Sequence, residues 1–404
     1  MKTQSHERNL DFDTVVNRRG TNCLKYDFAS ERGVVAPGEN PNDLIPLWVA
    51  DMDFKTSSFI QDALQKQVEH GIFGYTDTKE DYFSALQNFY LKRHRFFIPS
   101  DQWVIKTPGV MFMLAMAVNA FTQKGDAVLI QEPVYMHFRD LIEASGRKVA
   151  SNDLIYTQDY RYTIDFDDFE RKIVSKKVKL FLLCNPHNPV CRVWSKNELE
   201  TIGEICLKHR VIIVSDEIHN DFIFRGTHTM MASLSEEISN ITISVTTPTK
   251  TFNLAGLQIA HTFIRNESLR RAIRREIDAV AYSQVPSTGI TAAFAAYTKG
   301  ETWLNALLEY IRGNIDYTNE FVRNHLPGIG MVPMEATYLA WLDFNGLGKS
   351  AREIDDIMLH RAKLWMNGGS RFGKNGAGFE RLNLACPRAT LETALQRIEA
   401  AFYG

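Results

Sequence analysis

Residues 179–216, KLFLLCNPHNPVCRVWSKNELETIGEICLKHRVIIVSD, contain the pattern that decides the fold. The apolar runs KLFLLC (179–184) and VIIVSD (211–216) flank an amphipathic stretch at 195–208 with helical spacing. Strands that are apolar throughout are typical of a parallel sheet covered by helices, because neither face of such a strand meets water. The segment therefore predicts a strand, a helix and a second, parallel strand.

The same alternation precedes this segment and stops well after it. Apolar runs at 103–106 and 127–131 alternate with helix-like stretches at 109–123 and 135–145. From about residue 300 the pattern changes to long amphipathic stretches (302–325 and 350–365) around the run TYLAWLDF (337–344), whereas the first 50 or so residues lack any such alternation. The sequence thus predicts a large α/β domain followed by a smaller α+β unit.

Length and charge limit the class of protein. A chain of 404 residues suggests two or three domains, and two is the working number. The formal net charge of -2 gives no reason to expect nucleic acid or an anionic membrane as a partner, so small molecules are the expected partners.

The cysteines and the apolar runs indicate a cytoplasmic protein without a membrane segment. The five cysteines are odd in number and include no C-x-x-C pair, which argues against a disulfide framework and a zinc site. The start, MKTQSHERNL, lacks the apolar core of a signal peptide. The run VMFMLAMAV is far shorter than the ~20 residues of a membrane span, and it is expected to be a buried helix.

Three polar residues follow apolar strands at the positions where open α/β sheets bind ligands. Asn185 follows LFLLC, Asp216 follows VIIVS, and Lys250 lies in a Thr/Pro/Lys turn after ITISV. Each alone also suits a plain structural role: an Asn-Pro turn, a helix N-cap or a solvated surface lysine. Their order, with about thirty residues between successive members, is the arrangement of a pyridoxal-phosphate site.

The strings RRGTNCLKYD, LIPLWVADMDF, NPHNPV, SDEIHNDF, PTKTFNLAGLQ and RLNLACPR resemble the class-I/II aminotransferase superfamily. Within it, the chain resembles the MalY/PatB-type cystathionine β-lyases, or C-S lyases, over nearly its whole length. The resemblance implies the fold-type-I architecture of pyridoxal-phosphate enzymes, with a mostly parallel, seven-stranded sheet in the large domain. It implies a large domain at residues 50–295 and a small domain built from residues 1–49 and 296–404.

The resemblance also implies the roles of the three strand-exit residues. Lys250 carries pyridoxal 5′-phosphate as a Schiff base and moves the proton at Cα, Asp216 pairs with the pyridinium nitrogen, and Asn185 bonds to the cofactor's 3-oxygen. Physical chemistry agrees with two of these roles. A buried carboxylate keeps the ring nitrogen protonated, and burial beside a cationic ring makes a lysine nucleophilic near neutral pH.

The cofactor phosphate is expected at a helix N-terminus, where free amides and the helix dipole favour a dianion. Gly109, Val110 and Met111 in TPGVMFMLAM open such a helix, although the segment alone would equally suit a core helix after a turn. By resemblance, Thr247 is a hydroxyl ligand of the same phosphate. Tyr75 in FGYT resembles a tyrosine that reaches the neighbouring subunit's phosphate in a homodimer.

Three further residues complete the expected pocket. By resemblance, Tyr135 stacks on the pyridine ring, Arg381 grips the substrate α-carboxylate, and Asp51 with the flanking WVADMDF lines the substrate pocket. A bidentate guanidinium suits a carboxylate ligand. Without the family match, Tyr135 would be amphipathic packing and Arg381 a surface residue.

Three positions depart from the common aminotransferase pattern. Cys191 stands where the motif beginning NPxNP usually continues with glycine, so the local backbone differs or the turn avoids positive φ. His219 replaces a tyrosine bonded to the cofactor's 3-oxygen, and Gln258 replaces a phosphate-binding arginine. Both replacements suit the C-S lyase subgroup.

The expected reaction is therefore β-elimination from cystathionine or related cysteine S-conjugates, giving a thiol, pyruvate and ammonia. The alternative is an aminotransferase, which uses the same motifs. The motifs supply no second arginine for a substrate side-chain carboxylate, which argues against a dicarboxylic transaminase substrate. A different class, a binding or regulatory protein that retains the fold, is disfavoured because Lys250, Asp216 and Arg381 are all present.

Overall fold

The computed structural model of the chain describes residues 6–35 and 38–404. Its centre is a seven-stranded sheet with the strand order β2-β10-β9-β8-β7-β3-β4. These strands are β2 (Val104–Thr107), β3 (Ala127–Ile130), β4 (Lys148–Ser151), β7 (Leu180–Cys184), β8 (Ile212–Asp216), β9 (Thr242–Thr246) and β10 (Ala260–Phe263). β10 runs antiparallel to β2 and β9, and the other neighbours are parallel. The predicted fold-type-I architecture, with a mostly parallel sheet of seven strands, is confirmed.

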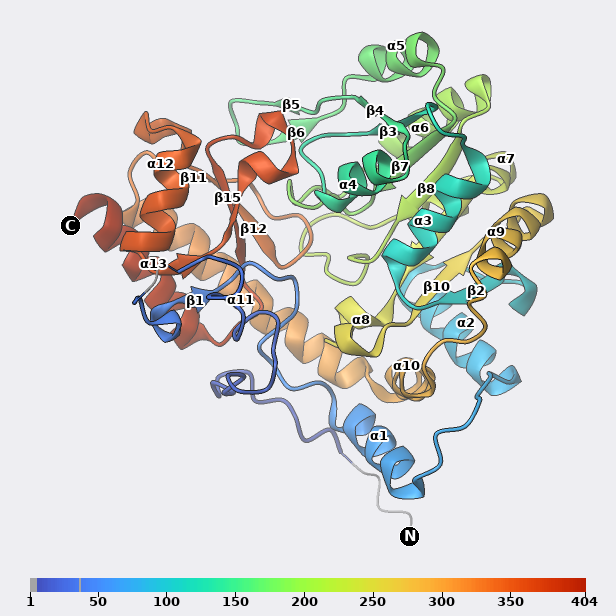
Figure 1. The fold of residues 1–404 in the computed structure, drawn as a ribbon, viewed down its shortest axis with the longest axis horizontal. Coiled ribbons are helices and arrows are strands. Elements are labelled where there is room, and N and C mark those ends of the chain that lie inside the picture. Colours follow the sequence, from blue (N-terminus) through green and yellow to red (C-terminus); the bar gives the residue numbers. More distant parts are fainter. Residues whose placement is uncertain (1–5, 36–37) are drawn as a thin grey trace.

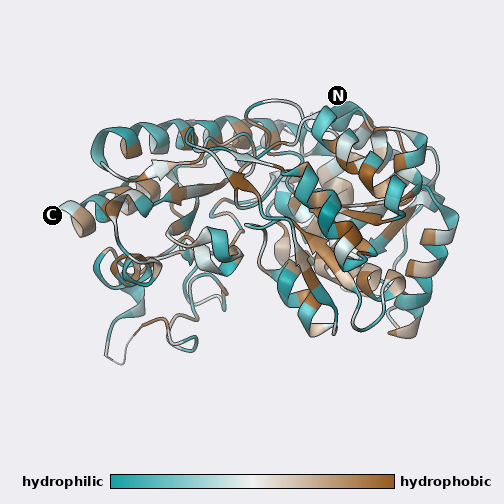
Figure 2. Cartoon of the chain, turned by 90° about the horizontal axis from the view of Figure 1, so that it is seen from above, coloured by the Kyte–Doolittle hydropathy of each residue, from teal (hydrophilic) through white to brown (hydrophobic). Residues whose placement is uncertain are grey.

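The sheet is buried because its strands are apolar on both faces. In β7, Phe181 and Leu183 belong to one apolar core, whereas Leu180 and Leu182 belong to a second core on the opposite face. Helices supply the other half of each core, as Figure 2 shows, where the brown strands lie among surrounding helices. The helices before residue 300 are α1 (Ser58–His70), α2 (Glu80–His94), α3 (Val110–Phe121), α4 (His137–Ala144), α5 (Phe166–Lys176), α6 (Lys196–His209), α7 (Glu236–Asn240), α8 (Pro248–Thr251), α9 (Glu267–Ala279) and α10 (Ser287–Lys299).

A second, smaller unit contains an antiparallel sheet with the order β11-β12-β15-β14. Its elements are α11 (Glu301–His325), β11 (Gly330–Met331), β12 (Leu339–Asp343), α12 (Ala351–Asp356), β13 (Leu364–Trp365), β14 (Asn367–Gly368), β15 (Phe379–Asn383) and α13 (Arg388–Tyr403). Figure 1 shows α11 running from the neighbourhood of α10 into this unit. A short hairpin of β5 (Ile155–Tyr156) and β6 (Tyr162–Thr163) forms a separate sheet, and Tyr156 and Tyr162 contact β12 through hydrogen bonds with Asp343 and Trp341.

The start of the described chain packs with its end. β1 (Ile45–Pro46) pairs in parallel with β13, and Figure 1 shows the blue N-terminal segment beside the orange and red C-terminal elements. Both ends of the chain thus contribute to one unit, as expected of the small domain. The exact domain boundaries at residues 50 and 296 stay a prediction. In the part of the chain that the structure describes, no helix is both long and apolar enough to cross a membrane.

Two local expectations differ from the structure. The stretch 350–365 is not one regular helix, because α12 passes into a π-helical turn at Ile357–Arg361 and Lys363 adopts a left-handed φ of 55°. Pairing of β13 with β1 then fixes the following residues as a strand. The turn expected around Lys250 is the one-turn helix α8, which Thr247 caps and Pro248 begins.

Candidate active site

The strand exits at Asn185, Asp216 and Lys250 lie at one edge of the large sheet. The pairing of β7 with β8 sets Cys184 opposite Asp216, and the amide of Asn185 donates to the carbonyl of Asp216 at 2.9 Å. β9, the next strand, ends one residue before the cap of α8. The carboxyl ends of three adjacent parallel strands therefore bring these residues to the same edge.

Lys250 is held with its amine in the interior. Its Nζ donates to the carbonyl of Ala50 at 2.7 Å. Burial lowers the pKa of Lys250 to about 8, against the opposing effects of Asp51 and Asp216. An appreciable fraction of the amine is thus uncharged near neutral pH, as a nucleophile or a proton acceptor requires.

Asp216 is a buried carboxylate with few partners. Burial raises its pKa to about 7, and the backbone N–H of Ile218, 3.3 Å from Oδ1, opposes that rise. A neighbouring cation would stabilise the ionised form of this carboxylate, because the cation offsets much of the free-energy cost of burying the negative charge.

Asn185 and His219 each present an unpaired polar atom. Asn185 Nδ2 donates to the carbonyl of Thr229 at 3.1 Å. Asn185 Oδ1 and His219 Nδ1 are buried without a hydrogen-bond partner among the residues that the structure describes. Burial lowers the pKa of His219 to about 3, so its ring is neutral at physiological pH. Buried polar atoms of this kind indicate a ligand that completes their bonding.

Arg381, on β15, is a buried cation without an acidic partner. Its Nη1 donates to Asn188 Oδ1 at 3.1 Å, its Nη2 donates to the carbonyl of Trp48 at 2.9 Å, and its guanidinium lies over the ring of Phe372. Nε has no partner, and no carboxylate within residues 6–35 and 38–404 forms an ion pair with Arg381. Burial lowers its pKa to about 10. The side chain is therefore arranged to receive an anion from outside the chain.

One cavity of about 240 Å³ joins Asp216, His219, Lys250 and Arg381, whereas Asn185 lies outside its lining. Five of the expected site residues line it: Tyr135, Asp216, His219, Lys250 and Arg381. Its other lining residues are Leu24, Trp48, Val49, Ala50, Met136, His137, Cys184, Asn188, Ile218, Asn367 and Arg371. The phenol of Tyr135 has a pKa raised to about 12 by burial, so the ring is neutral.

The expected phosphate site is only partly tested by the geometry. Gly109 is the N-cap of α3 with φ 108°, and a Cβ built on it would meet open space. Val110 and Met111 follow as the first helical residues, whose amides have no acceptor within their own helix. These three residues lie outside the lining of the cavity, and their role stays a prediction. Thr247 Oγ1 already donates to the carbonyl of Ile259 at 2.6 Å and accepts from the amide of Thr249.

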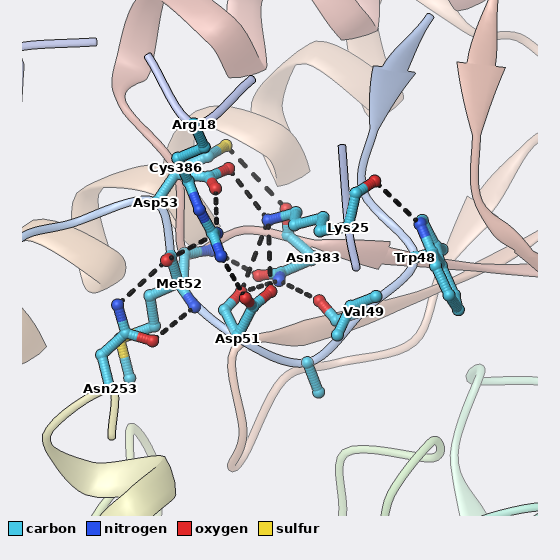
Figure 3. A network of polar contacts seen from close by, with 12 residues as sticks. Arg18, Lys25, Trp48, Val49, Asp51, Met52, Asp53, Asn253, Asn383 and Cys386 are labelled. Carbon is cyan, nitrogen blue, oxygen red and sulfur yellow. Dashed lines mark hydrogen bonds and ion pairs between the residues drawn. The ribbon is translucent and has the colours of Figure 1, made fainter. Parts of the chain in front are cut away.

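Asp51 directly follows three residues that line the cavity. The flanking residues Trp48, Val49 and Ala50 line the cavity, whereas the Asp51 carboxylate lies outside that lining. Figure 3 shows it in an ion-pair network, 2.5 Å from Arg18 Nη2. The charge of this carboxylate also acts on Lys250, where it opposes the lowering of the pKa by burial, so the expected place of Asp51 at the substrate pocket stays a prediction.

The remaining expected residues lie apart from the cavity. Tyr75 is 96% exposed in a loop together with exposed Ile72 and Phe73. Cys191 adopts φ 60°, so the expectation that its turn avoids positive φ is wrong. Its buried thiol donates to the carbonyl of Leu339 at 3.1 Å, a contact that helps to hold this conformation. Gln258 ends a 3-10 turn with φ 45°.

Sequence reasoning missed several of the lining residues. Asn188 could have been found, because it is the second asparagine of the NPHNP motif. Arg371 could not: it lies in a 3-10 turn, Gly369–Phe372, with no motif around it. Its Nη1 donates to Asn367 Oδ1 at 3.3 Å. Because Arg371 lines the cavity, the argument from the lack of a second arginine is wrong.

The site fits pyridoxal 5′-phosphate on the chemistry of its donor set. It offers one amine with a lowered pKa, one buried carboxylate for a cationic ring nitrogen, and unpaired atoms on Asn185 and His219. The helix N-terminus at Gly109 offers amides for a phosphate. Arg381 offers a buried guanidinium with an unpaired Nε for the carboxylate of an amino acid.

Comparison with known proteins agrees with this geometry. Cystathionine beta-lyase PatB of Bacillus subtilis (strain 168) is 39% identical over 393 residues, which cover 97% of this chain and 100% of that protein. Cystalysin from Treponema denticola, whose crystal structure contains a pyridoxal 5′-phosphate cofactor, has a TM-score of 0.91 at 35% identity, covering 97% and 98% of the two chains. The pyridoxal-phosphate-bound C-S lyase from Staphylococcus hominis has a TM-score of 0.89 at 31% identity, covering 98% and 99%.

The sequence profile described as "Aminotransferase class I and II" matches residues 42–398, nearly the whole chain. With the mostly parallel, seven-stranded sheet and the full-length relatives, this match identifies the chain as a member of the class I and II aminotransferase family.

Proposed function

We propose that this chain is a pyridoxal-phosphate-dependent C-S β-lyase that cleaves cystathionine or related cysteine S-conjugates. The names of its full-length relatives support this activity. The observation that carries it is the meeting of Lys250, Asp216 and the unpaired Arg381 in one cavity. Together they offer a base, a partner for a ring cation and a carboxylate ligand.

The binding of the amino acid begins at Arg381. Its guanidinium takes the α-carboxylate, which supplies the anion that the buried cation lacks. Asn185, Asp216 and the N-terminus of α3 would hold the cofactor, and the contact with Arg381 would orient the Cα–H bond of the amino acid toward Lys250. When bound, pyridoxal 5′-phosphate supplies an electron sink for the pair of electrons left at Cα.

Lys250 moves the protons. With a pKa of about 8, its amine accepts the Cα proton near neutral pH and can return a proton afterwards. Loss of the Cα–H bond and then of the Cβ–S bond releases a thiol and a three-carbon enamine. One water molecule hydrolyses the enamine to pyruvate and ammonia, so no oxidant or reductant is consumed.

An aminotransferase is the second candidate, since Arg371 in the cavity removes the argument against a dicarboxylic substrate. A second arginine in the cavity can bind the side-chain carboxylate of a dicarboxylic amino acid. The same arginine can equally bind a carboxylate on the leaving thiol of an S-conjugate. Product analysis therefore decides between the two reactions.

We also propose that the protein acts as a homodimer in the cytoplasm. An exposed apolar loop with Ile72, Phe73 and Tyr75 supports a contact with a second copy. The five cysteines, all free and four of them buried, agree with a reducing compartment.

The test supplies the cofactor-loaded enzyme with L-cystathionine and no keto acid. Pyruvate and ammonia in equal amounts are expected. A parallel assay adds a panel of keto acids to the same sulfur amino acids. If amino transfer exceeds pyruvate release across the whole panel, the protein is an aminotransferase and the proposed lyase activity is wrong.

A further inference from the structure

Residues 47–54, which we call the strap, cross the active site without forming a helix or a strand. Main-chain and side-chain bonds hold the strap in place. Asn383 Nδ2 donates to the carbonyls of Val49 and Asp51, both at 2.7 Å, and Asn253 Nδ2 donates to the carbonyl of Met52 at 3.0 Å. An irregular segment with this many fixed carbonyls has a defined shape.

Two carbonyls of the strap accept hydrogen bonds from Lys250 and Arg381, two of the cationic side chains of the active site. The carbonyl of Ala50 accepts from Lys250 Nζ at 2.7 Å and from the hydroxyl of Tyr338 at 2.9 Å. The carbonyl of Trp48 accepts from Arg381 Nη2 at 2.9 Å and from Asn367 at 2.6 Å. A displacement of the strap would therefore move the partners of both Lys250 and Arg381.

On its other side the strap is fixed by an ion-pair cluster of two cations and two anions: Arg18, Lys25, Asp51 and Asp53 (Figure 3). Arg18 contacts Asp51 at 2.5 Å and Asp53 at 2.8 Å, and its Nη1 also donates to the carbonyl of Met52 at 3.2 Å. Lys25, with a side chain that is 0% exposed, contacts Asp53 at 2.9 Å. The charges balance, as a partly buried cluster requires.

We propose that the ion-pair cluster positions the strap and, through the two strap carbonyls, orients Lys250 and Arg381. Arg18 and Lys25 are then positioning residues that touch neither cation. The inference rests on the proposed function only in taking Lys250 and Arg381 as the groups that must be oriented.

The ion-pair cluster also affects the protonation of the Lys250 amine, because one member of the cluster, Asp51, acts on it. The charged groups that face Lys250 are Asp51 from the strap, Asp216 from β8 and Arg381 from β15. Arg18 neutralises the first of these. Removing the charge of Arg18 leaves Asp51 with the more distant Lys25, whose Nζ lies 3.9 Å from Asp51 Oδ1, and favours the protonated amine of Lys250, whereas removing the charge of Asp51 has the opposite effect.

The variants are chosen because removal of the positive charge and removal of the negative charge are expected to affect the protonation of Lys250 in opposite directions. Arg18→Gln and Asp51→Asn each remove one charge at nearly constant size, and Arg18→Lys keeps the charge. Arg18 is suitable for substitution because its side chain is 23% exposed, so a shorter side chain does not leave a closed cavity in the core. The matched control is Arg8→Gln, which breaks the exposed 2.6 Å ion pair with Asp62 in the same N-terminal region.

The measurement is the rate at which an amine reagent labels Lys250 in the full-length, cofactor-free chain across pH, followed by mass spectrometry. At pH 7, Arg18→Gln is expected to slow labelling about threefold or more, since each pKa unit changes the free amine about tenfold. Asp51→Asn is expected to speed it, and Arg18→Lys and Arg8→Gln should match the wild type. Thermal unfolding of each variant gives the stability separately.

A cluster that only stabilises the fold would lower the melting temperature and leave the labelling profile of Lys250 unchanged. That result would overturn the proposal. Labelling needs no turnover, so the proposed function can fail in the pyruvate assay while the cluster is tested independently.

Discussion

Asp216 and Arg381 are both charged groups that are buried without an ion-pair partner among residues 6–35 and 38–404. Burial moves both toward neutrality, raising the pKa of Asp216 to about 7 and lowering that of Arg381 to about 10. Folding therefore places two groups in surroundings that cost stability unless a ligand supplies the opposite charge. Such a cost is typical of a binding site and can be measured.

Replacement of Asp216 by asparagine should stabilise the cofactor-free chain at high pH. The pKa of about 7 in the folded state exceeds the ordinary value of 3.8. Between these values the folded state binds more protons than the unfolded state, so the wild type loses stability as pH rises from about 4 to 7. At pH 8 we expect Asp216→Asn to be more stable by on the order of a few kcal/mol, with no gain near pH 4.

Urea unfolding at the two pH values measures this difference, with the exposed Asp316→Asn as the control. Turnover of the cofactor-loaded Asp216→Asn should fall steeply, because an amide does not hold the ring nitrogen protonated. A wild type and a variant with the same pH dependence of stability would show that Asp216 is not the buried acid assigned here.

Arg371 should select substrates with a distal carboxylate. Arg371→Met is expected to raise the KM roughly tenfold for S-conjugates whose thiol half carries a carboxylate, such as L-cystathionine. For S-methyl-L-cysteine, which lacks that group, the KM should change little. Steady-state kinetics with both substrates measure the difference between the two changes in KM. The control is Lys374→Met, because Lys374 is an exposed neighbour of Arg371. An equal change for both substrates would exclude this role.

Among the elements, the N-terminus of α3 has a backbone conformation that only glycine adopts readily. Gly109 has φ 108° and ψ 169°, so an alanine there costs about 1–3 kcal/mol although a Cβ has room. If the first amides of α3 bind the phosphate, Gly109→Ala should weaken cofactor retention roughly tenfold. Fluorescence titration of the cofactor-free chain measures the affinity.

Gly125, just beyond the other end of α3, provides the comparison. It has φ 89°, and a Cβ there would also meet open space. Gly125→Ala should lose comparable stability and keep its cofactor affinity. Equal affinities in the two variants would remove α3 from the phosphate site.

The sequence predicted those elements whose pattern of apolar and polar residues can be recognised within the segment itself. Phe181 and Leu183 identify β7 because a strand buried on both faces leaves no polar residue in its run. Asn185 and Lys250 were found because they follow such strands. Arg371 was missed because the fold of the small unit, not a local motif, brings it to the cavity. The left-handed turn at Cys191 was missed because a tertiary contact with Leu339 helps to hold it.

At the scale of the whole molecule, the loop with Ile72, Phe73 and Tyr75 is the feature that a single chain leaves unexplained. The double substitution Ile72→Asp and Phe73→Asp should convert a dimer of twice 46.1 kDa into monomers, because buried charges disfavour an apolar contact. Size-exclusion chromatography with light scattering measures the mass. Val174→Asp, which changes an exposed apolar residue on α5, should stay dimeric. A fully active wild-type monomer would refute the dimer.

The strap meets Lys250 and Arg381 with main-chain oxygens, and every amino acid supplies the same oxygen. Exchange of the side chains at Trp48 or Val49, which line the cavity, therefore leaves these two contacts chemically intact. The segment can change its preference for a leaving group by point substitution while the groups that handle the proton and the carboxylate keep their partners. Directed evolution of new thiol leaving groups would accordingly begin with libraries at these two positions.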